Sequence, residues 1–338
     1  MRSSTRTQGP NYLSPAFYLG RAITAVVDYV AKKNKGPDAR ILDSIVVDFK
    51  RGILCGTAGM PAEILTEHEA ATAWERRDFF REGYALGLAA LHALTFSRGN
   101  PERRNRHPHN FRIMHYTGYG VWNAFAGMVG LPRISNDPNC WLDVPDFARY
   151  RLFMAGGDAY GKVVMKRCIT AKFFQNFERT TDRTATQAAW HGCGRALWFC
   201  WTGDTHALVS LLRLYPPATS ALAMGLGTAI TFTQIGAPDR VQASIHGFPT
   251  FFHDLLAQGS GMALGGMIVE NPAVSDRVYA LYSGDLRRRL DETLQAAEEA
   301  RIATLSSPER WYGTFFTQLE RIRSRNAAMN PSVSLVTE

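Results

Sequence analysis

Apolar residues recur every three or four positions over most of the chain, which is the spacing of one face of an α-helix. The first such segment covers 12–33, where the recurring residues are Phe17, Leu19, Ile23, Val26, Val27 and Val30. The same periodicity predicts helices over 66–95, 111–129, 184–201, 204–215, 220–235, 251–269, 272–303 and 308–328. The alternation of apolar and polar residues that indicates half-buried strands is nearly absent.

Two segments are less regular. Residues 43–55 form a short β-branched run that fits either a strand or the start of a helix. Residues 146–177 read as two helices that break at Gly156–Gly157. The helix over 66–95 has the clearest predicted start, because Glu69 follows Thr66 with the spacing of a capping box.

The pattern as a whole predicts a mainly α protein, folded as a single compact multi-helix domain over 11–328. Gly83 and Gly87 lie one helical turn apart, which allows another backbone to approach closely, so we expect glycine-notched, closely packed helices. Residues 1–10 are small, polar and basic and are expected to be disordered, and 329–338 are expected to form a loose tail.

Composition limits the classes of function. The chain has 338 residues, of which 46% are hydrophobic and 20% charged, as in ordinary globular proteins. The formal net charge of +8 raises the possibility of nucleic-acid binding. The basic residues are spread along the chain, however, with short clusters only at Arg103–Arg106 and Arg287–Arg289. Neither cluster carries interleaved aromatic residues, so no nucleic-acid partner is expected, and the second is interpreted as a solvated helix face.

The expected location is the cytoplasm. Five cysteines without a CxxC pair indicate neither a disulfide framework nor a structural zinc site. No signal peptide is evident, and no run of about 18 apolar residues suggests a stable membrane span. The helix over 12–33 is compatible with an amphipathic anchor on a membrane surface, but a helix that packs on the core is the favoured interpretation.

The segment Trp190–Trp201, WHGCGRALWFCW, is the best pointer to a site. His191 and Arg195 are four residues apart and therefore share one face of the predicted helix. They lie among aromatic side chains that favour burial. A buried cation requires a partner, so either a carboxylate or a ligand is expected to meet Arg195.

Three carboxylates are candidates for proton transfer or for pairing with Arg195. Glu82 lies on the apolar side of its predicted helix, although an ion pair to Arg81 or Arg77 explains it equally well. Asp158 follows two glycines, where a ligand can approach closely, and a helix N-cap is an equal alternative. Asp204 is better explained as an N-cap than as a catalytic residue.

Cofactor motifs are weak. His107, His109 and His115 have spacings that occur in metal sites, but no suitable carboxylate follows and the loop around the first two is basic. His115 is the member favoured for a functional role. Three GxG pairs lack the third glycine, strand and acidic residue of a dinucleotide site. We therefore expect neither a metal nor another cofactor.

Around Trp190–Trp201, and over most of 40–300, the chain resembles the enediyne-biosynthesis UnbL-like group of bacterial proteins (domain of unknown function 1702). The segments that match are Glu82–Gly83 with Gly87, His115–Trp122, Gly194–Phe199, Tyr215–Pro216, Gly225–Ala229, Gln258–Ala263 and Asn271–Pro272. The chain departs from the group in three places: GGDAYG has no histidine, Ala218–Ser220 replace an arginine pair, and Ser275–Asp276 lack a histidine. The resemblance implies an accessory protein in the assembly of a natural product, with a polyene or polyketide as ligand.

The leading hypothesis is a biosynthetic cyclase, isomerase or lyase that folds or tailors an apolar polyene, polyketide or terpenoid-like substrate. The proposed catalytic residues are Glu82, Asp158, His191 and Arg195. The proposed substrate-binding residues are His115, Trp122, Trp190, Trp198, Phe199 and Trp201. One alternative is a non-catalytic carrier or a partner of other pathway enzymes. The other is a metal oxygenase centred on the three histidines. A homo-oligomer is compatible with each of these functions.

Overall fold

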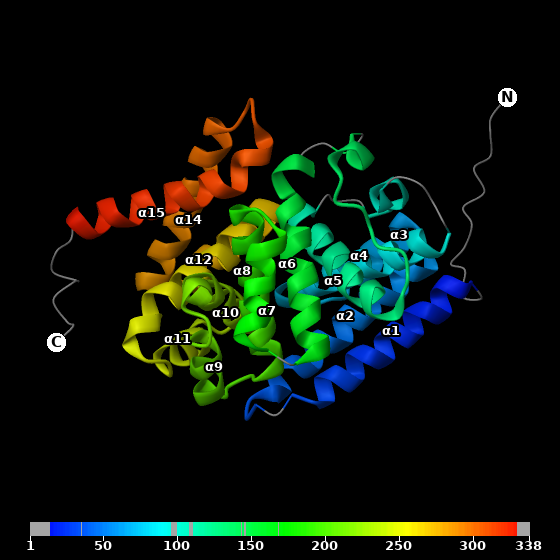
Figure 1. Cartoon of the computed structure of the whole chain (residues 1–338), viewed down its shortest axis with the longest axis horizontal. Coiled ribbons are helices and arrows are strands. Elements are labelled where there is room, and N and C mark those ends of the chain that lie inside the picture. Colours follow the sequence, from blue (N-terminus) through cyan, green and yellow to red (C-terminus); the bar gives the residue numbers. More distant parts are fainter. Residues whose placement is uncertain are drawn as a thin grey trace.

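The computed structural model describes residues 14–34, 36–95, 100–107, 111–142, 144, 147–167 and 169–329. These residues form fifteen α-helices and no strand (Figure 1), so the predicted mainly α single domain is confirmed. The expected disordered residues 1–10, His109 and the part of the predicted tail beyond 329 lie outside the described residues.

The helices begin and end as follows: α1 Pro15–Lys32, α2 Asp43–Ala58, α3 Ala62–Ala70, α4 Arg77–Leu94, α5 Arg112–Val129, α6 Phe147–Lys166, α7 Ala171–Thr180, α8 Arg183–Cys200, α9 Thr205–Leu212, α10 Thr219–Gln234, α11 Pro238–His246, α12 Thr250–Glu270, α13 Ser275–Leu281, α14 Gly284–Ala303 and α15 Trp311–Met329.

The long helices pack largely in chain order. Each of α2, α4, α5, α6, α8, α10, α12, α14 and α15 contacts the next of this series. Figure 1 shows the resulting progression, from α1 and α2 at one side of the molecule to α14 and α15 at the other. Helices α12 and α5 are also in contact, although they are not neighbours in this series: the Glu270 carboxylate at the end of α12 accepts hydrogen bonds from the backbone N–H groups of Ile113 (3.0 Å) and Met114 (3.4 Å) in α5.

The predicted close approach at Gly83 and Gly87 is confirmed. A Cβ at either position would collide with the backbone of α2, at the carbonyls of Phe49 and Ile53 respectively. Glycine costs roughly 1 kcal/mol relative to alanine inside a helix. The backbones of α2 and α4 gain dispersion contacts in return, since their separation is smaller than side chains would permit.

The predicted single helix over 66–95 is wrong, because the chain turns between α3 and α4. Thr66 lies inside α3, where its hydroxyl donates to the Ala62 carbonyl, so it is not an N-cap. Glu69 forms a buried ion pair with Arg81 instead of closing a capping box. The turn at 71–76 brings α3 beside α4 and makes this pair possible.

The predicted break at Gly156–Gly157 is also wrong, since both glycines lie within α6. Their missing side chains admit the neighbouring helices, with the Gly157 position against the Thr117 carbonyl of α5. The actual break precedes α7, where the Thr170 hydroxyl accepts from the Phe173 N–H as an N-cap. Residues 43–55 belong to α2, which excludes the strand, and 272–303 divide into α13 and α14.

The first helix packs on the core. The apolar face of α1 contacts α2 and α4, and Ile23 is 2% exposed. None of the described helices is both long enough and apolar enough to cross a bilayer.

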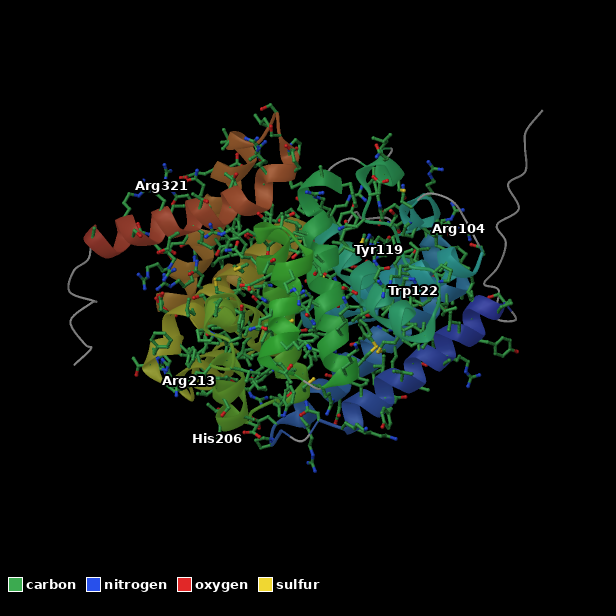
Figure 2. All side chains as sticks on the ribbon, viewed as in Figure 1. Arg104, Tyr119, Trp122, His206, Arg213 and Arg321 are labelled. Atoms are coloured by element: carbon green, nitrogen blue, oxygen red, sulfur yellow. The ribbon has the colours of Figure 1, made fainter. Side chains whose placement is uncertain are left out.

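Basic residues are dispersed over the surface. Figure 2 shows Arg104, Arg213 and Arg321 at three separate places around the molecule. In the Arg287–Arg289 cluster, Arg287 pairs with Asp291 and Arg288 pairs with Asp285. The predicted solvated face is therefore correct for these two, whereas Arg289 is buried.

Candidate functional site

A series of three apolar cavities runs between the helices. The first cavity, about 100 Å³, lies among α5, α6, α8, α10, α12, α14 and α15. The second cavity, about 110 Å³, lies among α1, α2, α4, α5, α6 and α8. Between them is a central cavity of about 20 Å³. It shares Met114, Arg195 and Phe232 with the first cavity, and Phe79, Glu82, Tyr160 and Phe199 with the second.

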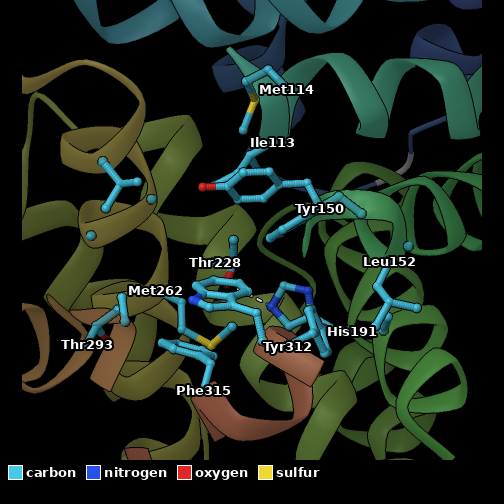
Figure 3. A pocket seen from close by; sticks show the side chains of 18 of the residues that line it. Ile113, Met114, Tyr150, Leu152, His191, Thr228, Met262, Thr293, Tyr312 and Phe315 are labelled. Carbon is cyan, nitrogen blue, oxygen red and sulfur yellow. Dashed lines mark hydrogen bonds between the residues drawn. The ribbon is translucent and has the colours of Figure 1, made fainter. Parts of the chain in front are cut away.

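Figure 3 shows the first cavity from close by. His191 and Thr228 lie together near one end, with Tyr312 and Phe315 beside them, and Met114 lies toward the other end. The imidazole Nε2 of His191 is 3.2 Å from the Thr228 hydroxyl. The walls are otherwise mainly apolar, so the rest of this cavity is suited to a hydrocarbon chain.

Glu82 is the most unusual residue of the central cavity. Its side chain is 7% exposed, and among the described residues no hydrogen bond or ion pair engages its carboxyl. The pKa of this carboxyl is raised to about 7. Burial is the largest cause, the positive charge of Arg195 acts in the opposite direction, and the negative charge of Asp78 adds to the rise. A substantial fraction of Glu82 is therefore protonated at neutral pH.

Arg195 contributes an unpaired cation to the same place. Its Nε is buried without a hydrogen-bond partner, and no ion pair joins its guanidinium to a carboxylate of the described residues. The guanidinium carbon lies 5.5 Å from the centre of the Tyr160 ring, a distance at which the ring face attracts a cation. The predicted carboxylate partner is thus absent from the part of the chain that the structure describes, which leaves a ligand as the remaining candidate.

Asp78 is a further cavity residue that was not predicted from the sequence. One carboxylate oxygen, Oδ1, accepts a 2.6 Å hydrogen bond from Arg81, whereas the buried Oδ2 has no partner. Burial raises the pKa of Asp78. Asp78 and Glu82 both border the central cavity, and their i,i+4 spacing on an apolar helix is the signal that would have identified the pair.

The structure gives His191 a narrower role than general acid–base catalysis. Burial, aided by the charge of Arg195, lowers its pKa to about 3. The imidazole is therefore neutral at physiological pH, so it can hydrogen-bond a ligand but is a weak proton acceptor. Its position beside Arg195 is maintained by close packing of α8 on α10, since a Cβ at Gly225 would collide with the His191 carbonyl.

Of the four aromatic residues of the segment Trp190–Trp201 that were predicted to bind substrate, Phe199 alone borders these three cavities. Phe199 continues the stripe of His191 and Arg195 at i+8 and lines the central and second cavities. Trp190 donates from Nε1 to the Phe174 carbonyl (3.3 Å), and Trp198 donates to the Thr233 hydroxyl (2.8 Å). Trp201 packs against the hydrophobic core. Neighbouring residues of a helix project about 100° apart, so a dense aromatic run cannot line a single wall.

Asp158, His115 and Trp122 also lie away from the three cavities. Asp158 forms an ion pair with Lys162 on the same helix. The indole of Trp122 donates to the Pro132 carbonyl (3.1 Å). His115 contacts the Glu102 carboxylate at 3.3 Å, and His107 contacts Glu69 at 3.0 Å. Asp204 is an N-cap, as predicted, since its side chain accepts from the Ala207 N–H.

The described residues contain no group of three or more His, Cys, Asp or Glu side chains placed to hold a metal ion. Cys55, Cys140, Cys193 and Cys200 are free thiols. Burial raises the pKa of the Cys55 thiol to about 11 and that of Cys200 to about 12, so neither is a thiolate at neutral pH.

Comparison with known proteins does not add a function. No protein-family model matches the chain, and no curated protein or solved structure is significantly similar to it.

Proposed function

We propose that this protein is an acid–base enzyme of natural-product biosynthesis, a cyclase or isomerase that acts on an elongated, apolar, polyene-like substrate. The observation that carries the proposal is the buried, unpaired carboxyl of Glu82 in the narrow middle of a series of apolar cavities. The substrate lies along the cavities, with the reacting carbons beside Glu82. The biosynthetic setting rests on the resemblance of 40–300 to the UnbL-like group, which is itself part of the proposal.

Glu82 is the proton donor in this reaction. With a pKa raised to about 7, its carboxyl is an effective general acid at neutral pH. The proton passes to one carbon of a substrate double bond, leaving a carbocation on the substrate and a carboxylate on Glu82. After rearrangement or ring closure, the carboxylate removes a proton from a carbon next to the cationic centre. The product then has the same atoms and electrons as the substrate.

The residues around Glu82 favour the substrate carbocation on one side of its carboxyl and the negative charge of the carboxylate on the other. Rings of Phe79, Phe199 and Phe232 border the central cavity and present surfaces that stabilise a carbocation. Arg195 repels a second cation, but it stabilises the Glu82 carboxylate once the proton has left. The cation is therefore expected to form on the side of Glu82 that faces away from Arg195.

The test is a comparison of the wild type with Glu82→Gln in an extract of cells that supply the substrate. The cells are grown in ordinary water, and the extract is transferred to deuterated buffer. Products are extracted from the purified protein and from the reaction mixture and are separated by chromatography. Their molecular masses are then measured by mass spectrometry. We expect Glu82→Gln to lower product formation by about 10²–10⁴-fold, the usual contribution of a general acid. Each wild-type product molecule is expected to carry a solvent-derived deuteron, because the Glu82 proton exchanges with solvent before transfer.

Asp158→Asn is the matched control, since this carboxylate lies outside the cavities and is paired with Lys162. It should form product at a rate within about threefold of the wild type, the range of an ordinary surface substitution. Equal product formation by Glu82→Gln and the wild type would refute the proposed role of Glu82.

A non-catalytic carrier is the second candidate, because apolar cavities that reach from α1 to α15 also suit the storage of a hydrocarbon chain. A carrier leaves its ligand chemically unchanged. The same experiment separates the two functions: the ligand extracted from a carrier has no deuteron from this step, and Glu82→Gln carries the same molecule as the wild type.

A further inference from the structure

The position of the polar groups along the three cavities limits the chemistry of the ligand. Arg195 and Glu82 border the narrow central cavity, and an apolar cavity extends on each side of it. The two outer cavities have nearly the same volume, about 100 and 110 Å³. A site for a ligand with a polar head at one end would instead have its charged groups at one end of a single apolar space.

The polar groups in the middle are also incomplete. Among the described residues, the buried Nε of Arg195 has no acceptor, the buried Oδ2 of Asp78 has no donor, and the carboxyl of Glu82 has no partner. Buried polar groups without partners are costly, and a ligand that supplies the missing hydrogen bonds recovers this free energy. Each outer cavity, in contrast, provides mostly apolar contacts.

We infer that the ligand is a slender molecule with an oxygen-bearing group in the interior of its chain, next to the reacting double bond, and with an apolar arm of similar length on each side. This inference rests on the proposed function and names its substrate class. One arm occupies the first cavity, between α5 and α15, and the other occupies the second cavity, beneath α1. A carbonyl oxygen in the middle accepts from Arg195, which leaves protonated Glu82 to face the neighbouring double bond.

The first test uses binding alone. Two ketones of identical composition, 7-tridecanone and 2-tridecanone, differ only in whether the carbonyl lies in the middle or near the end of the chain. Their affinities for the full chain are measured by calorimetry, with tridecane as the hydrocarbon reference. We expect 7-tridecanone to bind about tenfold more tightly than 2-tridecanone, the contribution of a hydrogen bond to a charged donor. Arg195→Met should reduce this ratio to about twofold or less, whereas an equal ratio in wild type and variant contradicts the inference.

The second test fills one arm at a time. Gly266 lines the first cavity, and a Cβ there has only an ordinary contact of 3.9 Å with Ile113, so we expect the side chain of Gly266→Leu to occupy part of the cavity. Val27 lines the second cavity from α1, where Val27→Phe occupies the corresponding space. Each variant should weaken 7-tridecanone binding by about tenfold or more, since half of the ligand loses its apolar contacts.

Matched controls exist for both substitutions. Gly313→Leu makes the same change in α15, where a Cβ has contacts of 3.6 and 3.8 Å with Thr184 and lies outside the cavity lining. Val47→Phe makes the same change at a position that is 61% exposed. Both should bind 7-tridecanone like the wild type. If only one of the two filling variants weakens binding, the ligand occupies only one of the two outer cavities, and the inference fails.

The outcomes separate this inference from the proposed function. Loss of the preference for 7-tridecanone together with an inactive Glu82→Gln would refute the two-armed ligand and leave acid catalysis intact. A clear preference for 7-tridecanone together with an active Glu82→Gln would support the two-armed ligand and remove Glu82 as the acid.

Discussion

Two buried polar clusters lie close together in this molecule, and they differ in whether their charges are paired. In the paired cluster, Glu69 contacts Arg81 and His107, and Glu102 contacts Arg112 and His115. In the cavity cluster, Glu82 and Arg195 have no such partners among the described residues. Burial alone therefore does not mark a functional carboxylate, and the absence of partners is the informative feature.

The presence or absence of partners changes the pKa values of the buried carboxyl groups. Burial acts to raise the pKa of Glu69 and of Glu102, but their hydrogen bonds and positive neighbours outweigh it and lower both values to about 2. Burial without a hydrogen bond raises the pKa of Glu82 to about 7. Arg81 and Glu82 are adjacent in α4, so one turn of helix carries both a buried ion pair and a buried carboxyl without a partner among the described residues.

The largest effect on folding is expected at the paired cluster. Glu102→Gln leaves the Arg112 guanidinium without its buried carboxylate, so we expect a loss of about 3–5 kcal/mol in the free energy of unfolding. Glu82→Gln breaks no pair and should change this free energy by about 1 kcal/mol or less at pH 5, where the wild-type carboxyl is still protonated in the folded protein. Urea denaturation measures both. A larger loss for Glu82→Gln than for Glu102→Gln would reverse the comparison.

The two clusters should also respond to pH in opposite directions. The pKa of Glu102 is lowered on folding, so its stabilisation is complete above its ordinary pKa of 4.5 and is lost as pH falls towards 2. The pKa of Glu82 is raised, so its contribution is complete below 4.5 and is lost as pH rises through 7. Glu82→Gln cannot ionise, so its free energy of unfolding does not fall in this way as the pH rises through 7.

At pH 8, Glu82→Gln should therefore be more stable than the wild type by up to about 3 kcal/mol, with little difference at pH 5. The raised pKa of Glu270, about 8, acts in the same direction but is common to both proteins. The check is a series of denaturation curves from pH 5 to pH 8. A constant difference between the two proteins would show that Glu82 has an ordinary pKa.

The smallest expected effect concerns the aromatic residues of α8. Phe199→Leu removes a ring from the central cavity and should lower product formation by about 5–30-fold, corresponding to roughly 1–2 kcal/mol of cation stabilisation. Trp190→Phe alters a residue outside the three cavities and should leave the rate within about twofold. Equal losses would mean that the effect comes from packing.

Much of this arrangement can be predicted from the sequence. Periodicity predicts the helical class, the bounds of α8 to within one residue, and the shared face of His191 and Arg195. The choice of Glu82 as a candidate site residue follows from its place on an apolar helix. The break between α3 and α4 does not, because Thr66 and Glu69 have the spacing of a capping box, and only the structure shows that Glu69 pairs with Arg81 instead.

The cavity lining is harder to predict for a related reason. Trp190 and Trp198 have the composition expected of a binding wall, but the helices packed on α8 decide which face is open. Asp78 was missed because half of its carboxyl is paired with Arg81 and only the structure shows that the other oxygen is not. The second cavity depends on α1 packing against helices that are distant in sequence.

The most direct test of the account is the titration of the Glu82 carboxyl itself. Infrared difference spectra between the wild type and Glu82→Gln isolate the C=O stretch of its protonated form as pH is varied. We expect a protonated carboxyl at pH 6 that ionises with a pKa of about 7. A carboxyl that is already ionised at pH 6, with a pKa of 4.5 or below, would show that Glu82 is paired and would contradict its role as the acid.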